Sequence, residues 1–474
     1  MTSSALDDDG PLAPALVRVL LIASFGSFLL NLSSTTVNVA IDPLMKDLHA
    51  PLSEIQWIIT GYLLALTLVL PSFRWAVERL GSRRLYVWCL VGFTATSALS
   101  SLAWSAPSLI AFRVLQGTVG GLLTPLTQAL IAQLAGPKRM GRAVGIMSVP
   151  VLVAPVLGPV LGGLVIQRLS WRWLFLFNIP FGLAGAWLAQ RRLPSGETAA
   201  RTPLDLVGLA LLSPGVALFV WGVSAFGRAH GAFSPRVIAP LAIAVALIAS
   251  FVAYARRRPT TALLDLNVFR NRTVSAALAT YLLASLGTFG AALILPLYYQ
   301  QVRGASPLTA GMLIAPQGIG MMLTLPQVGR LSDRFDPGKV CIAGVLTALA
   351  GTIAFTQATD HSSYLLLSLS LVVRGAGLGA TSTPALAAAY KHLRRDEIPN
   401  ATTALNIVQR LGAPIGTATM AVTLQRFAVG AGKSPALLAR AFAHTFTVSA
   451  ALGALALFAA FRLIAANNPE RTTP

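Results

Sequence analysis

Fourteen apolar stretches, each long enough to cross a bilayer, constrain this chain more than any other feature. A helix needs roughly 20 mostly apolar residues to cross the hydrocarbon core. Only 11% of the 474 residues are charged and the mean hydropathy is +0.70, which is typical of an integral membrane protein and not of a soluble domain. We therefore expect an all-α membrane protein whose spans begin near residues 15, 52, 84, 107, 142, 171, 204, 236, 273, 306, 339, 363, 400 and 440.

The start of the chain and its two cysteines add little to this fold class. The first ten residues, MTSSALDDDG, are polar and acidic, so they lack the basic start of a signal peptide and we expect no cleavage. Cys89 and Cys341 lie in separate apolar stretches, which favours packing residues over a disulfide or a metal site.

The net charge of +20 raises the question of a nucleic-acid partner. The basic residues lie in the connections between the apolar stretches: with the N-terminus inside, 24 of the 36 Lys and Arg residues lie on the inner side and nine on the outer side. This bias predicts that both termini are cytoplasmic. The charge thus marks topology and contact with membrane lipid, and we expect no nucleic-acid partner.

Internal repetition divides the chain. RWAVERLGSRR follows the second span and GRLSDRFDPGK follows the tenth, 255 positions later; FRVLQG and VVRGAGLG place Arg113 and Arg374 261 positions apart. Spans 1 to 6 and 9 to 14 therefore read as two copies of one six-helix unit, with an inserted hairpin between them, which is the organisation of an alternating-access carrier. The expected parts are a tail at 1–14, bundles at 15–192 and 259–466, the hairpin with its linkers at 193–258, and a tail at 467–474.

Several motifs in this order resemble the major facilitator superfamily, and specifically its fourteen-span drug:proton antiporter branch of the EmrB and QacA type. They are TTVNVAI (35–41), FRVLQG (112–117), APVLGPVLGG (154–163), RWLFLFNIPFG (172–182), LPLYYQQVRGASPLTAG (295–311) and NIVQRLGAPIG (406–416). The resemblance implies multidrug efflux across the inner membrane with the proton as coupling ion and no other cofactor. It also implies that a monomer is sufficient for transport, with a periplasmic adaptor as a partner where the cell has an outer membrane.

The fifth span carries an unusual strip of proline and glycine. Such residues weaken a helix in water but are tolerated in a membrane bundle, where they give a smooth face for close packing. The resemblance implies that this strip is the antiporter signature, which seals the two halves against leak. Its members are Pro155, Gly158, Pro159, Gly162 and Gly163.

The repeated inner loop is the candidate cytoplasmic latch. In GRLSDR, Gly329 permits close approach of two helix ends, and Asp333 and Arg334 can pair with neighbouring groups. The first copy keeps Glu78 and Arg79, but Arg74 replaces the glycine, which weakens the prediction for that half. The competing interpretation of both copies is a solvated charged loop.

Three arginines, Arg113, Arg374 and Arg410, fall within apolar spans, where a central arginine costs about 2.5 to 3.5 kcal/mol unless it is compensated. The resemblance gives Arg113 the role of coupling proton movement to substrate movement. The alternative for all three is a structural role, in which they bind backbone carbonyls of a neighbouring span.

No acidic residue falls in the middle of a span. The matched branch usually has an aspartate where this chain has Ser33. A proton-coupled carrier needs a group that changes protonation while facing each side in turn. Asp42 and Glu54, at the outer ends of the first two spans, are the remaining candidates.

Three arginines without buried acids predict an electropositive cavity that favours neutral or anionic amphiphiles over lipophilic cations. This leaves two functions open: proton-coupled drug export, or export or flipping of neutral or anionic amphiphiles or lipids without coupling at the usual carboxylate. An enzyme is not expected because no HExxH or GxSxG motif occurs, and a receptor without transport stays open. Candidate cavity residues, each also compatible with helix packing, are Ser33, Asn38, Gln116, Gln128, Tyr281, Tyr298, Tyr299, Gln300, Gln317 and Asn406.

Overall fold

The computed structural model describes residues 12–136, 139–194, 203–226, 235–258, 262–391, 393–394, 396–429 and 434–467. All of the regular structure in these ranges is helical. The helices of the first part are α1 (Pro14–Thr36), η2 (Val37–Ala40), α2 (Ile41–Asp47), α3 (Leu52–Val69), η3 (Leu70–Ser72), α4 (Phe73–Leu80), α5 (Ser82–Ser101), α6 (Ala106–Gly120), α7 (Leu123–Ala135), α8 (Met140–Arg168), α9 (Trp173–Leu176) and α10 (Asn178–Arg192). They are followed by α11 (Leu206–Phe226), α12 (Pro235–Arg257), η5 (Leu266–Arg270), α13 (Arg272–Leu297), the π-helical turn η6 (Tyr298–Val302), α14 (Pro307–Arg334), α15 (Pro337–Thr356), α16 (Tyr364–Lys391), α17 (Ile398–Phe427) and α18 (Pro435–Asn467).

Polar residues and glycines set the ends of these helices. Ser105 caps α6 by accepting a hydrogen bond from the backbone N–H of Ser108, and Asp336 and Asn271 cap α15 and α13 in the same way. Gly81 ends α4 with a positive φ of 74°, a conformation in which a side chain is disfavoured. Local sequence therefore places the turns between spans.

Ten helical units in the described residues are long and apolar enough to cross a membrane. Four more long helices, α5, α8, α14 and α17, have 20 to 30 residues each and are not among these ten. Two of these helices, α8 and α14, pack closely on each other through glycines. The ten units are Pro14–Thr36, Glu54–Leu80, Ala106–Ala135, Trp173–Arg192, Leu206–Ala225, Val237–Arg257, Arg272–Val302, Pro337–Thr356, Tyr364–Lys391 and Pro435–Ala465.

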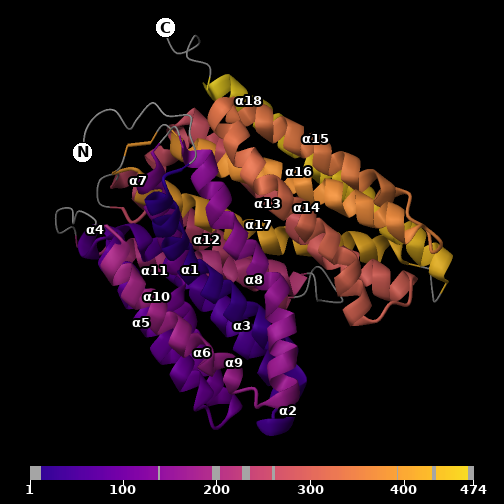
Figure 1. Ribbon diagram of the computed structural model, residues 1–474, viewed down its shortest axis with the longest axis horizontal. Helices are drawn as coiled ribbons and strands as arrows, with labels where there is room; N and C mark the ends of the chain where they lie inside the picture. Colours follow the sequence, from indigo (N-terminus) through magenta and orange to yellow (C-terminus); the bar gives the residue numbers. More distant parts are fainter. Residues whose placement is uncertain are drawn as a thin grey trace.

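The helices form two groups (Figure 1). Helices α1 to α10, indigo to magenta, pack with one another, and α13 to α18, orange to yellow, do the same. The start of α1 and the end of α18 lie on the same side of the molecule, which we call the terminal side; α2 lies on the opposite side. The two groups meet near the terminal side and diverge away from it, and all contacts between α8 and α14 described below lie within the first turns of α8.

The hairpin of α11 and α12 lies against both groups. Trp221 of α11 stacks on Trp57 of α3, with ring centroids 5.0 Å apart, and α11 also packs on α17. On the other edge, Asp265 and Asn400 exchange backbone and side-chain hydrogen bonds of 3.0 and 2.9 Å, which fasten the segment after α12 to the start of α17. The hairpin thus bridges the two groups along the α3 and α17 side.

Candidate functional site

Arg113 lies in the middle of α6 and is completely buried. Its Nη1 donates to Oε1 of Gln116 at 2.6 Å and to Oγ of Ser33 at 3.4 Å, and its Nε donates to the backbone carbonyl of Ile58 at 3.4 Å. The guanidinium lies 3.8 Å from the ring centroid of Tyr62, a cation–π contact. Helices α1, α3 and α6 therefore hold this cation among neutral groups.

Arg113 has no acidic partner among the residues that the structure describes. Its Nη2 is buried and has no hydrogen-bond partner there. Ser33, at the position where the matched branch usually has an aspartate, is the α1 residue that contacts it. A guanidinium with one unsatisfied nitrogen in a low-dielectric site attracts an anion strongly, because the charge is poorly screened there.

Tyr62 connects this site to the other group of helices. The guanidinium of Arg113 stacks on the Tyr62 ring, and the charge of Arg410 in α17 also acts on the Tyr62 side chain. Arg410 is partly exposed, whereas Arg113 is not.

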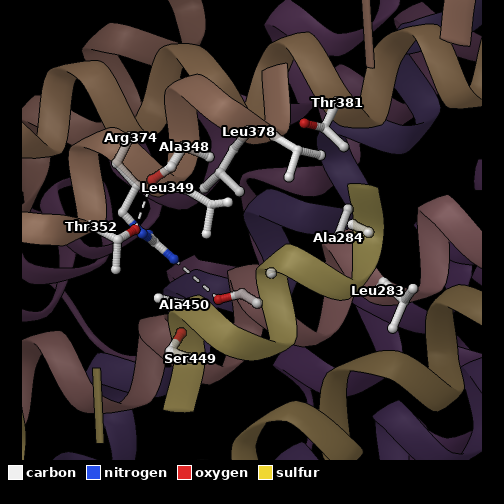
Figure 2. A pocket seen from close by; sticks show the side chains of 14 residues that line it. Leu283, Ala284, Ala348, Leu349, Thr352, Arg374, Leu378, Thr381, Ser449 and Ala450 are labelled. Carbon is white, nitrogen blue, oxygen red and sulfur yellow. Dashed lines mark hydrogen bonds between the residues drawn. The ribbon is translucent and has the colours of Figure 1, made fainter. Parts of the chain in front are cut away.

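Arg374 holds the corresponding place in α16 and is 4% exposed. It donates to Oε1 of Gln317 in α14 and, at 3.1 Å, to the backbone carbonyl of Gly287 in α13. A cavity of about 40 Å³ lies beside it (Figure 2). Like Arg113, this arginine has only neutral partners among the described residues.

One hydrogen bond between side chains links the two groups in the interior. Nδ2 of Asn406 in α17 donates to Oε1 of Gln128 in α7 at 2.6 Å, and both side chains are buried. Two residues of the predicted cavity therefore meet across the interface between the groups.

The predicted latch residue Asp333, near the end of α14, lies at the start of α8. Its carboxylate accepts hydrogen bonds from the backbone N–H of Gly141 at 2.8 Å and of Arg142 at 3.3 Å, and from Nε of Arg142 at 2.7 Å. An anion at a helix N-terminus is favourable because the first N–H groups lack intrahelical acceptors. Asp333 thus acts as a charged cap on a helix of the other group.

Glycines let the two backbones meet at this cap. A Cβ on Gly141 would lie 2.4 Å from the carbonyl oxygen of Gly329, and a Cβ on Gly329 would lie 2.7 Å from that of Gly141. Gly145, one turn further along α8, faces the backbone of Leu325 in the same way. At this contact, backbone atoms of the two groups therefore face each other directly.

The first copy of the loop is arranged differently. Glu78 pairs with Arg74 one turn earlier in α4, at 2.8 Å, and Arg79 lies over the ring of Trp75 at 5.9 Å. These contacts are within α4. Arg334, the last residue of the second copy, is exposed.

The glycine strip of α8 packs mainly against α1. A Cβ on Gly158 would lie 2.0 Å from Oγ1 of Thr35, whereas one on Gly163 would meet nothing within 4 Å. Gly162 is buried and Gly163 is half-buried; the side chains of Pro155 and Pro159 lie outside the described part of the structure. The strip thus joins two helices of one group, and the contact with α14 lies about three turns earlier, at Gly141 and Gly145.

Other predicted residues lie apart from these sites. Tyr298 donates from its hydroxyl to the carbonyl of Thr359 at 2.7 Å and packs among Phe355, Phe442 and Phe446, and Tyr299 packs beside it, so both belong to the core of the second group. Tyr281 is buried in the core that both groups share. Gln300 is exposed and Glu54, in the first turn of α3, is half-buried. The side chains of Asn38 and Asp42 lie outside the described part.

The sequence did not predict three residues that contact Arg113 or Asp333: Tyr62, Gly141 and Arg142. Their partners are 51 to 192 positions away in the chain, so no local pattern announces the contacts. One weak signal for Arg142 exists: it follows Gly141 at the start of a span, and the GRLSDR motif predicts that a helix end comes close to Gly329.

Two arginine-bearing helix groups, joined on one side by a charged cap, are the arrangement of a secondary transporter. Comparison with known proteins supports this: residues 23–417 and 277–474 match the model of the Major Facilitator Superfamily, and the chain belongs to that family. The resemblance deduced from the motifs is thereby confirmed, and the protein is a multi-pass membrane transporter and not an enzyme.

Its relatives include export proteins. The chain is 40% identical over 412 residues to the Multidrug resistance protein B homolog of Mycobacterium tuberculosis (strain ATCC 25618 / H37Rv), covering 86% of this chain and 76% of the relative. It is 33% identical to the Tetracenomycin C resistance and export protein of Streptomyces glaucescens (76% and 66% covered) and 29% identical to the Multidrug export protein EmrB of Haemophilus influenzae (85% and 79% covered).

Solved structures share the fold at low identity. The human organic anion transporter MFSD10 is 17% identical, with a TM-score of 0.64 over 94% of this chain and 100% of that one. A double-tryptophan mutant of the transporter XylE is 15% identical, with a TM-score of 0.66 over 95% and 96%. The all-helical fold predicted from the sequence is confirmed.

Proposed function

We propose that this transporter exports amphiphilic drugs and other xenobiotics from the cytoplasm by alternating access, in exchange for protons. The observation that carries the proposal is the cap formed by Asp333 on α8, with the two backbones in contact at Gly141 and Gly329. A carrier must seal one side of its interface while the other side opens, and a charged, glycine-lined contact confined to one side suits that task. The names of the relatives support drugs as the substrate class.

In this proposal the fourteen long helical units cross the inner membrane in a six, two and six arrangement, with bundles at 15–192 and 259–466 and the inserted hairpin at 193–258. The terminal side is then the cytoplasmic side. The charge bias of the loops supports this orientation, because 24 of the 36 basic residues lie there. The Asp333 cap accordingly closes the cytoplasmic entrance.

Arg113 is the proposed coupling residue, and Asp42 and Glu54 are the proposed proton carriers, since Ser33 cannot carry a proton at the usual place. Arg374 and Arg410 contribute positive charge, and Gln116, Gln128, Gln317 and Asn406 supply polar contacts for the substrate. In this scheme Asp42→Asn uncouples transport from the pH gradient while transport down a substrate gradient continues.

The second candidate is export of anionic or neutral amphiphiles without proton coupling at the usual carboxylate. A specific observation favours it: Arg113 contacts Ser33 and has a buried Nη2 without a partner among the described residues. An acidic group on the substrate would supply the missing charge. The two candidates differ in whether substrate movement carries protons in the opposite direction.

Purified protein in liposomes with an imposed pH gradient tests both. A drug-dependent collapse of the gradient, together with drug movement, supports antiport. Movement of an anionic amphiphile with an unchanged gradient supports the second candidate. If neither cationic, neutral nor anionic amphiphiles move in vesicles that hold folded protein, the exporter assignment fails.

A further inference from the structure

The cavity beside Arg374 has a polar end and an apolar end. Helices α13, α15, α16 and α18 line it, and Figure 2 shows Arg374, Thr352 and Ser449 gathered at one end, with Leu283 and Ala284 at the other. The site lies within the second group of helices and away from the Asp333 cap.

The polar end has unused hydrogen-bond donors. A guanidinium has five N–H groups, and the two acceptors of Arg374 among the described residues are Gln317 and Gly287. Ser449 is 5% exposed, lines the cavity and has no hydrogen-bond partner among the described residues. Thr352 donates to the carbonyl of Ala348 at 2.7 Å, so its hydroxyl proton is already used. One cation and one hydroxyl donor therefore face a space without an acidic side chain in its lining.

The size and charge of the cavity restrict which ligand it can bind. A space of about 40 Å³ admits a monatomic anion or a few waters, and it is far too small for an amphiphile, which needs several hundred Å³. A buried cation with neutral partners is costly, and an anion in contact with it lowers that cost much more than water does, because the local dielectric is low. The positive charge of Arg374 selects against a cation.

We propose that this cavity binds one small monovalent anion, chloride in the cell, between the guanidinium of Arg374 and the hydroxyl of Ser449. The bound ion serves as the counter-charge that Arg374 lacks among the described residues. The test measures ion binding and unfolding, so its outcome does not depend on transport.

The test measures the thermal unfolding of the purified full-length transporter in detergent while chloride replaces gluconate at constant ionic strength. Constant ionic strength removes general screening, and gluconate is too large for the cavity. We expect the unfolding temperature to rise with chloride and to saturate, as it does for any ligand that binds only the folded state, and bromide to act similarly. Binding of radiolabelled chloride to the same samples measures the occupancy directly.

Two variants on α18 make the test specific. Ser449→Ala removes the hydroxyl donor and should weaken chloride binding about tenfold, the usual effect of losing one hydrogen bond to a charged partner. Thr447→Ala is the matched control, because Thr447 is exposed, two residues away and outside the cavity; it should leave chloride binding unchanged. Indifference of the wild type to the anion would mean that the cavity holds only water, and an equal response of the wild type and Ser449→Ala would place any chloride elsewhere; either result overturns the proposal.

Discussion

The loop after the second helix of each half occurs twice in this chain, and its two copies use their acids in different ways. Asp333 reaches the other group of helices and accepts three hydrogen bonds at the start of α8, whereas Glu78 pairs with Arg74 inside its own helix. The first copy also lacks the glycine that lets backbones meet. The ion pair between the groups is therefore made by one copy, and duplication of the sequence has not produced a second such pair.

The two buried arginines also differ, but here the first half has the more enclosed residue. Arg113 is stacked on Tyr62 and fully enclosed, while Arg374 borders a cavity and has no aromatic ring against its guanidinium among the described residues. An arginine packed on a ring near the interface is placed to respond to changes there; one that borders an internal cavity is placed to bind something small. The first half thus carries the more specialised arginine and the second half the more specialised loop.

The strongest test of this difference is to replace each arginine in turn and compare the loss of export. Arg113→Ala should abolish export, a loss of at least about 100-fold, because no described neighbour replaces a buried central cation. Arg374→Ala should reduce export about tenfold, the scale of losing one charged hydrogen-bond network. Transport of a fluorescent drug in liposomes, normalised to folded protein, measures both. Equal losses would show that the arginines are equivalent, and wild-type rates in Arg113→Ala would refute its assignment.

The cap should show the next largest effect. Asp333→Asn keeps the shape but removes the charge that α8 and Arg142 share, which weakens the closed contact by about 2 kcal/mol and shifts the closed population roughly 30-fold. A cysteine placed at Ser148 in α8 should then react faster with a thiol reagent added from the terminal side. Reaction rates equal to those of the parent protein would mean that Asp333 does not hold this side closed.

The matched change in the first copy should be nearly silent. Glu78→Gln removes a pair spaced four residues apart on one helix, in which both side chains are about a quarter exposed or less, 25% and 21%. Such a pair contributes about 0.3 to 0.5 kcal/mol, so export should change less than about twofold. A loss as large as that of Asp333→Asn would show that the first copy also joins the two groups.

The smallest effect should come from the side opposite the terminal side. There, too, the two halves use different contacts within themselves. Asp47, after the first span, accepts hydrogen bonds from Trp171 at 2.7 Å and Arg172 at 3.0 Å. Those bonds, the one from Trp171 first, lower the pKa of Asp47 below its ordinary value of 3.8. In the second half Arg303 binds the carbonyl of Ser362 and the hydroxyl of Tyr364, with no acid.

A lowered pKa means that the folded state holds the proton less tightly than the unfolded chain. The stabilisation is therefore present above pH 3.8 and is lost as the pH falls through the lower pKa of the folded state. Asp47→Asn should lower the unfolding temperature slightly at pH 7, since the pair is about half exposed, and the gap to wild type should close in strong acid. A Tyr364→Phe variant should show a gap that does not depend on acid pH. Acid-independent behaviour of Asp47→Asn would contradict the assignment.

The helical fold and the family followed from the sequence because apolar length and loop chemistry are local properties. Val237, Arg272 and Pro337 begin their spans within two residues of the predicted starts. The partner of Asp333 did not follow, because Arg142 is 191 positions away and any basic loop residue would have served as well. The packing of Gly158 on α1 also required the structure: a glycine strip shows that some helix comes close, but not which one.

The backbone contact between Gly141 and Gly329 has a consequence for the cell that makes this protein. An alanine in place of either glycine would force α8 and α14 apart, because the new methyl group would overlap a carbonyl oxygen of the other helix. A carrier held slightly ajar at that point no longer divides two solutions, and small ions would follow the opening whether or not a drug is present. In the proposed carrier, we therefore expect an alanine at either position to dissipate ion gradients across the membrane before it lowers resistance to a toxin.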